Sequence, residues 1–130
     1  MLCVALTATS GLTLQGDLTP LEDAFLAAES TYGVDASFLA AVAALESGWG
    51  KSELAREKNN LFGWRGADGY MEFDSPEDCI DHVAEYLAEE YLDPDGLYYN
   101  GLSVEDVAKN YCGGNADWVK MVEEIMQSVS

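Results

Sequence analysis

Basic side chains are scarce in this 130-residue chain, which has 6 Lys and Arg against 24 Asp and Glu and a net charge of −18 at pH 7. Nucleic acids and anionic membranes are bound by basic surface that neutralises phosphates, so we expect neither as a partner. No apolar run approaches the roughly 18 residues of a membrane span, so we expect no membrane insertion. Only 3 prolines occur and 48% of the residues are hydrophobic, which argues against a disordered tail or linker.

Cysteine and histidine are also few. The three cysteines, Cys3, Cys79 and Cys112, leave one thiol over whichever pair forms, and no C-x-x-C spacing occurs. With one histidine, His82, a structural zinc site is not expected, and we predict neither a metal nor another cofactor. His82 lies among Asp and Glu and is expected to face solvent, which disfavours a cysteine nucleophile activated by it. The sequence leaves open whether Cys79 and Cys112 form a disulfide.

The length suits one domain whose core buries roughly two-thirds of the unfolded surface. We expect an N-terminal extension over residues 1–18 and a single helical domain over residues 19–130. The apolar start, Met1–Leu6, is short and lacks a basic region, so it does not resemble a signal peptide. The chain is therefore expected to be a domain of a longer secreted protein, or a protein that leaves the cell by lysis or on a phage particle.

Helix start and stop signals recur along the chain, as capping residues before apolar-periodic segments and as Gly or Pro after them. Thr19 is expected to open the first helix through a capping box, with Pro20 at its first position. Residues 59–69 have a turn-like composition, and residues 70–73 are expected to form a small strand. The predicted helices run from Thr19 to about Tyr32, from Asp35 to the Gly48 region, from Ser52 to Lys58, from Ser75 to before Asp93, from Val104 to Asn110, and from after Asn115 through Val129.

Glu46 ends an otherwise apolar segment, Phe38–Leu45. In a helix, Leu39 and Val42 share its stripe, so its carboxylate is expected to point with the buried face. Burial and a position near a helix C-terminus both raise a carboxyl pKa, because each disfavours the anion. A carboxyl group that stays protonated near neutral pH is what a glycosidase general acid requires. The same pattern also fits a structural Glu that hydrogen-bonds to nearby backbone.

A longer motif surrounds Glu46. Residues 46–52 read E-S-G-W-G-K-S and residues 58–63 read K-N-N-L-F-G. Together they closely resemble the signature of the glucosaminidase domain, the glycoside hydrolase family 73 type of cell-wall hydrolase, and weaker similarity spans about residues 22–127. The resemblance implies a lysozyme-like fold, mainly α-helical with at most a very small β-hairpin. It also implies that Glu46 is the catalytic acid.

A glycosidase normally needs a second carboxylate, as base or as nucleophile. Larger members of the family carry a long hairpin that contributes one, whereas this chain has only a short link between Gly63 and Ser75. Asp68 and Glu72 are the candidates in that link, and each can equally be a solvated surface residue. Alternatively, the acetamido oxygen of the substrate attacks the anomeric carbon. Tyr111 resembles a tyrosine that lines the family's substrate site and would position that group, although it also fits a core tyrosine.

Aromatic side chains cluster around the same link. Flat rings stack on the apolar faces of sugars, so we predict that Phe62, Trp64 and Tyr70 contact substrate, although the same rings also make ordinary core. Asn60 is predicted to hydrogen-bond an N-acetyl group of the substrate or to cap the turn. The two other tryptophans have strongly apolar neighbours and are assigned to packing: Trp49 and Trp118.

These features predict a peptidoglycan hydrolase that cleaves glycan strands, and an endo-β-N-acetylglucosaminidase with Glu46 as general acid fits them best. A muramidase or a lytic transglycosylase is an alternative on the same fold, and so is a wall-binding module without turnover. We expect a monomer that acts outside the cell or in the cell wall, or in association with a phage.

Overall fold

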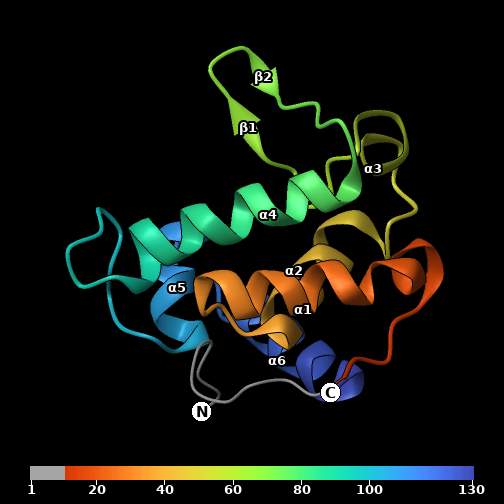
Figure 1. Ribbon diagram of the computed structural model, residues 1–130. Helices are drawn as coiled ribbons and strands as arrows, with labels where there is room; N and C mark the ends of the chain where they lie inside the picture. Colours follow the sequence, from red (N-terminus) through yellow and green to blue (C-terminus); the bar gives the residue numbers. More distant parts are fainter. Residues whose placement is uncertain (1–10) are drawn as a thin grey trace.

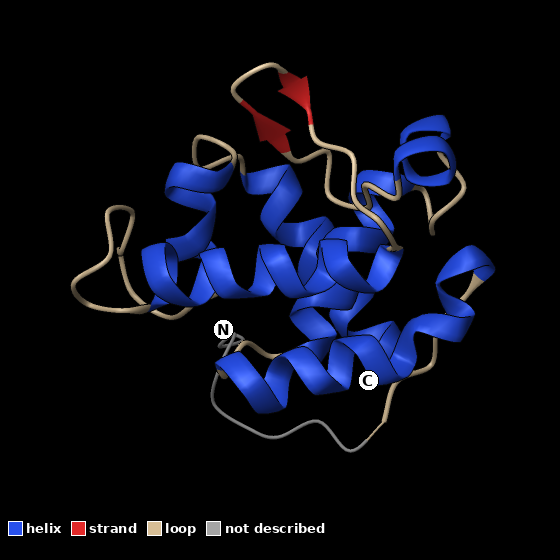
Figure 2. Cartoon of the chain, turned by 45° about the horizontal axis from the view of Figure 1, so that its top comes forward, coloured by secondary structure: helices blue, strands red, loops and turns tan. Residues whose placement is uncertain are grey.

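The computed structural model describes residues 11–130, and within them the chain is mainly helical (Figure 1). A two-stranded hairpin projects from the helices (Figure 2). This confirms the predicted mainly α-helical, lysozyme-like fold class. The elements are α1 (Glu22–Tyr32), α2 (Ala36–Ser47), α3 (Glu53–Lys58), β1 (Arg65–Gly66), β2 (Gly69–Tyr70), α4 (Pro76–Leu87), α5 (Val104–Tyr111) and α6 (Ala116–Val129).

Helix α2 forms the centre of the core. Every residue from Ala36 to Ala44 is buried, and α2 packs most extensively against α6 and also against α1. Helix α1 packs in turn against α4. A helix that is apolar on all sides requires other elements around it, and α2 has them. It reaches solvent at its C-terminal end, where Leu45 is half-buried and Glu46 is exposed.

Both predicted ends of α2 are confirmed. Asp35 is the N-cap, and its Oδ1 accepts the backbone N–H groups of Ser37 at 2.8 Å and Phe38 at 3.3 Å. Gly48 is the C-cap with φ 58°, a left-handed conformation that glycine adopts without steric cost.

The start of the first helix differs from the prediction. A 3-10 helix over Gly16–Leu21 precedes α1, so Pro20 lies inside that helix and not at the first position of an α-helix. The Thr19 hydroxyl donates to the carbonyl of Gly16 at 2.8 Å, so it does not cap α1. Because the preceding residues are already helical, their carbonyls lie behind the first N–H groups of α1, which therefore need no side-chain cap.

Residues 11–18, predicted to belong to an N-terminal extension, pack on the helical domain. Leu18 is fully buried, and the Thr13 N–H donates to the Val129 carbonyl at 2.8 Å. The segment Met1–Leu6 lies outside the described residues. The proposed extension therefore stays a prediction for the residues before 11.

The observed hairpin is shorter than the one expected from the predicted strand over residues 70–73. Arg65 lies opposite Tyr70 in an antiparallel pair. Gly66 lies opposite Gly69, so each strand has only two residues. The strand predicted at residues 70–73 thus ends near its predicted start, and beyond Tyr70 only single backbone hydrogen bonds follow, from the Met71 N–H to the Trp64 carbonyl and from the Phe73 N–H to the Lys58 carbonyl, each at 2.9 Å.

Serine residues cap the later helices as predicted. Ser75 begins α4, and Ser103 forms a capping box with Asp106 at the start of α5. A π-helix over Ala88–Leu92 continues α4, and within it Tyr91 is only 7% exposed. Insertions of this kind change the direction of the side chains that follow, and here one ring joins the core.

The described cysteines are both free: Cys79 is buried and Cys112 is half-buried. Cys3 lies outside the described residues. His82 is exposed, as predicted. Between residues 11 and 130, no helix combines the length and apolar character that a membrane span requires. The same part of the chain holds no group of three or more His, Cys, Asp or Glu arranged to bind a metal ion.

Candidate active site

Glu46 occupies the last turn of α2, and the chain after it is held tightly. Ser47 is 1% exposed; its hydroxyl donates to the Ala43 carbonyl at 2.5 Å and accepts the Gly50 N–H at 2.8 Å. Gly50 has φ 82°, and a Cβ at this position would lie 2.9 Å from the Cβ of Asp17. The serine and the second glycine of the E-S-G-W-G motif therefore fix the end of α2, and with it Glu46, against the 3-10 helix.

The Glu46 side chain is exposed, so the prediction that it points with the buried face is wrong. Helix α2 is buried on all sides, and the positions of Leu39 and Val42 therefore do not define a stripe that continues to the helix end. Although the residue as a whole is exposed, nearby protein atoms displace water from its carboxylate. This desolvation raises the pKa of Glu46, and a hydrogen bond from Trp118 lowers it to a smaller extent.

Tyr111 and Trp118 lie beside Glu46, although both are distant from it in sequence. Burial raises the pKa of the Tyr111 hydroxyl, and the negative charge of Glu46 raises it further. The rings of Tyr111 and Trp118 lie 5.4 Å apart at an interplanar angle of 34°. Trp118 is 7% exposed and lies near enough to Glu46 to lower the pKa of its carboxyl group. The prediction that Trp118 serves in packing did not include this proximity to Glu46.

Asn60 is 1% exposed, and its amide bonds to the protein itself. The Nδ2 group donates to the carbonyls of Trp64 and Met71, each at 2.9 Å, while Oδ1 accepts the Trp64 N–H at 2.9 Å. Asn60 thus joins the two arms of the hairpin at its base. Both of its N–H groups are engaged within the protein, which favours the alternative role of holding the turn, and the bond to an N-acetyl group stays a prediction.

Trp64 connects the hairpin to the residues around Glu46. Its ring centroid lies 5.3 Å from that of Tyr86 and 6.3 Å from those of His82 and Tyr111. Tyr111 lies 6.1 Å from Tyr91 on its other side. These rings form a continuous aromatic cluster between the hairpin and α6. The structure therefore brings the predicted substrate residue Trp64 next to the predicted catalytic residue Tyr111.

The other predicted residues have different surroundings. Phe62 is 3% exposed and packs in the core, which favours the alternative that its ring is ordinary core and not a sugar contact. Tyr70 is 47% exposed, with the guanidinium of Arg65 at 4.2 Å from its ring centroid. Asp68 lies in the hairpin turn and Glu72 just beyond β2, and both are exposed. These last three residues stay candidates on the hairpin.

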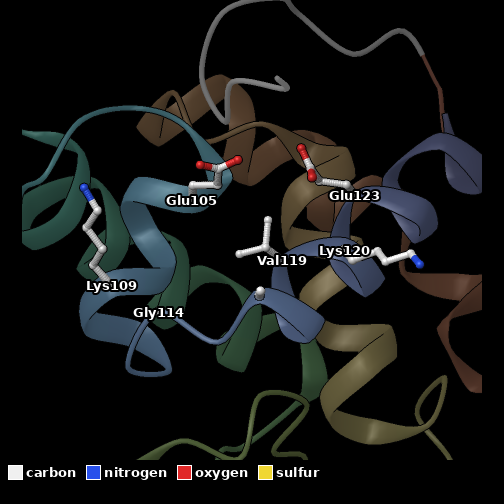
Figure 3. Close-up of a pocket in the computed structure, with 7 residues that line it drawn as sticks. Glu105, Lys109, Gly114, Val119, Lys120 and Glu123 are labelled. Carbon is white, nitrogen blue, oxygen red and sulfur yellow. The ribbon is translucent and has the colours of Figure 1, made fainter.

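A hollow of about 470 Å³ lies on α5 and α6 (Figure 3). Val119 lies at its centre, and Glu105 and Glu123 extend toward the same side of it (Figure 3). Lys109 and Lys120 point outward from its two flanks. None of the predicted site residues lines this hollow.

Comparisons with known proteins show the family to which the chain belongs. The family described as "Glucosaminidase: Mannosyl-glycoprotein endo-beta-N-acetylglucosaminidase" matches residues 22–130. Two Streptococcus pneumoniae proteins, from strains TIGR4 and R6, are both named "Putative endo-beta-N-acetylglucosaminidase". Each is 30% identical over 115 residues, which cover 82% of this chain but 17% and 16% of the two relatives. The chain thus spans less than a fifth of the length of these relatives.

Several solved structures share the fold. The catalytic domain of the autolysin Auto from Listeria monocytogenes has a TM-score of 0.66 and 21% identity, covering 85% of this chain and 81% of that one. S. aureus autolysin E in complex with the muropeptide NAM-L-Ala-D-iGlu has a TM-score of 0.70 and 21% identity, covering 97% and 69%. A catalytic mutant of autolysin E in complex with the disaccharide NAG-NAM has a TM-score of 0.67 and 21% identity, covering 90% and 67%. Because the family match extends over most of the residues, this chain belongs to the glucosaminidase family.

Proposed function

We propose that this chain cleaves the glycan strand of peptidoglycan as an endo-β-N-acetylglucosaminidase, with Glu46 as the general acid. The position of Glu46 carries the proposal. The side chain is exposed at the end of a buried helix, and its raised pKa favours the protonated form. A glycosidase acid must reach a polymeric substrate and must hold a proton for the leaving glycosidic oxygen, and Glu46 satisfies both requirements.

The substrate class is supported by the relatives. The pneumococcal proteins carry the name of an endo-β-N-acetylglucosaminidase, and two S. aureus autolysin E structures hold a muropeptide and the disaccharide NAG-NAM. Both ligands are fragments of peptidoglycan. We accordingly infer a site of action at the bacterial cell wall, reached by secretion or with a phage, and a protein that works as a monomer.

The electrostatic interaction between Tyr111 and Glu46 favours the acetamido-assisted route. In this route the acetamido oxygen bonds to the anomeric carbon while the glycosidic bond breaks, and Glu46 gives its proton to the leaving oxygen. Water then attacks the anomeric carbon, the bond between that carbon and the acetamido oxygen breaks, and the attacking water gives a proton to Glu46. The raised pKa of Tyr111 keeps its hydroxyl protonated throughout, so the hydroxyl is a donor that orients the acetamido group. Under the two-carboxylate route, Asp68 or Glu72 on the hairpin takes the second role.

Product analysis tests which bond is cut. Purified peptidoglycan is digested, the new ends are reduced with borohydride, and the fragments are weighed by mass spectrometry. A glucosaminidase leaves N-acetylglucosamine at the reducing end, so we expect its alditol. Reduced muramic acid would instead show a muramidase, and anhydro-muramic ends, lighter by one water, would show a lytic transglycosylase. Either result would overturn the proposed bond while leaving Glu46 as the acid.

A wall-binding module without turnover is the second candidate. The short hairpin favours the binding module, because each strand has only two residues. Among the described residues, no second carboxylate is found to interact with Glu46. The intact E-S-G-W-G segment and the raised pKa of Glu46 favour the enzyme. Binding to purified wall without release of any fragment would support the binding module.

A further inference from the structure

We propose that Arg65 and Tyr70, which face each other across the hairpin, bind a carboxylate of the peptide stems that peptidoglycan carries on its muramic acid residues. The pair thereby favours strands whose peptides are negatively charged over strands without charge. This inference deepens the proposed function and rests on the glycan strand of peptidoglycan being the substrate.

The backbone pairing places the two side chains side by side. Arg65 lies opposite Tyr70 in the antiparallel hairpin, and residues in that relation project from the same face of a sheet. The central carbon of the guanidinium lies 4.2 Å from the centroid of the tyrosine ring. This cation–π contact limits the rotation of the long arginine side chain, so less conformational freedom is lost when an anion binds to it.

The hydrogen-bond donors of Arg65 remain available to a ligand. A guanidinium that stacks through its flat face keeps its N–H groups, which point outward in the plane of the group. Arg65 is exposed, and within residues 11–130 no carboxylate lies at ion-pair distance from it. Arg56, by contrast, is paired with Asp17 at 3.0 Å. The donors of Arg65 therefore suit a carboxylate of the substrate, which they can bind through two parallel hydrogen bonds.

The charge of the whole chain makes this position informative. The protein has 24 acidic side chains against 6 basic ones, and Asp68 lies in the turn between the two strands, yet Arg65 stacks on a ring. A net charge of −18 repels an anionic polymer, although salt screens that repulsion beyond about 8–10 Å. Attraction to a negative group of the substrate must therefore come from a cation at the point of contact, and Arg65 is such a cation on the hairpin.

The hairpin connects this pair to the proposed catalytic site. Arg65 directly follows Trp64, whose ring centroid lies 6.3 Å from that of Tyr111. The amide of Asn60 holds both arms of the hairpin at its base, whereas Arg65 is exposed on the part that projects from the helices (Figure 1). A strand whose reacting sugar lies against Tyr111 can therefore extend along the hairpin to Arg65.

Peptidoglycan offers a group that matches this cation. Its N-acetylglucosamine units are uncharged, and the lactyl group of muramic acid is joined to the peptide by an amide bond. The negative charge of a peptide-bearing strand is therefore carried by the carboxylates of the peptide. Because muramic acid is the neighbour of each N-acetylglucosamine, these carboxylates belong to the sugar next to the bond that a glucosaminidase cuts.

Two ligands that differ only in charge test the proposal by calorimetric titration, in Glu46→Gln protein so that neither is cleaved. The first is the disaccharide NAG-NAM carrying L-Ala-D-iGlu, and the second is the same compound with both glutamate carboxylates amidated. We expect the Kd of the amidated ligand to be about tenfold higher, because it cannot accept charge-assisted hydrogen bonds from Arg65. With Arg65→Gln added, the two ligands should bind alike.

Three further variants separate the contact from a general effect of charge. Arg56→Gln removes the same charge at an exposed arginine of α3 and should keep the tenfold preference. Tyr70→Phe retains the ring under Arg65 and should also keep it. Tyr70→Leu removes the ring, so the preference should fall to about threefold.

The outcomes separate this inference from the proposed function. Equal affinity for the two ligands, or no binding of either, would overturn the inference, and so would a preference that survives in Arg65→Gln or disappears in Arg56→Gln. Displacement of the charged ligand by poly(glycerol phosphate) would assign Arg65 to wall phosphates and overturn the choice of a peptide carboxylate. A wild-type protein that distinguishes the ligands but releases no wall fragments would overturn the proposed function alone.

Discussion

The Asn60 side chain forms two hydrogen bonds with the backbone of Trp64: its Oδ1 accepts the Trp64 N–H and its Nδ2 donates to the Trp64 carbonyl, each at 2.9 Å. Neighbouring Asn59 donates in parallel to the Phe73 carbonyl at 2.9 Å. The two asparagines of the N-N-L-F-G segment therefore set the position of the whole hairpin. Through Trp64, they also set one side of the aromatic cluster that contains Tyr111.

Asn60→Ala is accordingly expected to damage both stability and activity. The change removes three partly buried hydrogen bonds and leaves the Met71 carbonyl without this donor, so the free energy of unfolding should fall by about 3 kcal/mol. Activity should fall further than the loss of folded protein explains, because Trp64 is no longer held. Urea unfolding and wall digestion measure the two effects. Asn100→Ala, at an exposed amide, is the control and should cost less than about 1 kcal/mol.

Glu46→Gln should abolish most turnover while preserving the fold. An amide cannot donate a proton as an acid, so the rate of wall digestion should drop by roughly 10²–10⁴-fold, and binding to wall should survive. In the wild type, kcat/KM should decrease as pH rises through the raised pKa of Glu46, since the acid must be protonated. Lysis by the variant at the wild-type rate would show that another group is the acid.

Thermal unfolding of the same variant provides a check on the direction of the pKa shift. A carboxyl whose pKa is raised on folding stabilises the fold fully below its unfolded pKa and loses that contribution as pH rises through the folded pKa. At pH 7, Glu46→Gln should therefore have a Tm equal to or above that of the wild type. The difference should vanish below about pH 4, where the unfolded carboxyl is also protonated.

Three conservative changes distinguish the two catalytic routes. If a second carboxylate acts, Asp68→Asn or Glu72→Gln should reduce turnover nearly as much as Glu46→Gln. If the substrate acetamido group acts, both should be close to wild type and Tyr111→Phe should be the damaging change. Initial rates on purified peptidoglycan decide between them. Wild-type rates in all three variants would mean that another group positions the reacting sugar.

Gly50→Ala tests the turn that holds the end of α2. Gly50 and Gly33 both have positive φ, 82° and 75°, so each alanine has a backbone cost of roughly 1 kcal/mol. At Gly33 nothing lies within 4 Å of the added Cβ, whereas at Gly50 it would lie 2.9 Å from the Cβ of Asp17. Gly50→Ala should therefore destabilise the protein by about 1–3 kcal/mol more than Gly33→Ala, as measured by urea unfolding. Equal losses would show that the 3-10 helix moves away freely.

Local signals predicted the helices well because they act over a few residues. Asp35, Ser75 and Ser103 cap the helices they were expected to cap, since a cap needs only the next two or three N–H groups. The prediction that Thr19 caps the first helix was wrong because a local pattern does not report the structure of the residues before it. The capping pattern is present there, but the residues before it already form a 3-10 helix, which no local pattern indicated.

The site was harder to predict than the helices because burial is decided by tertiary packing. The motif identified Glu46, yet its exposure depends on where the core ends around α2. Phe62 and Trp64 are both aromatic residues in one short segment, but one is buried in the core and the other is half-buried against Tyr111. The proximity of Trp118 to Glu46 arises from the packing of α6 on α2, and no spacing in the sequence encodes it.

The exposure of Glu46 has a consequence for how a long polymer is processed. Glu46 is exposed at the end of α2, and the strands of the hairpin are only two residues long. A strand does not have to be threaded from a free end to bring a bond to such an acid; it can be laid across the protein anywhere along its length. We therefore expect early digests of long strands to contain fragments of many sizes, and not a steady release of disaccharides.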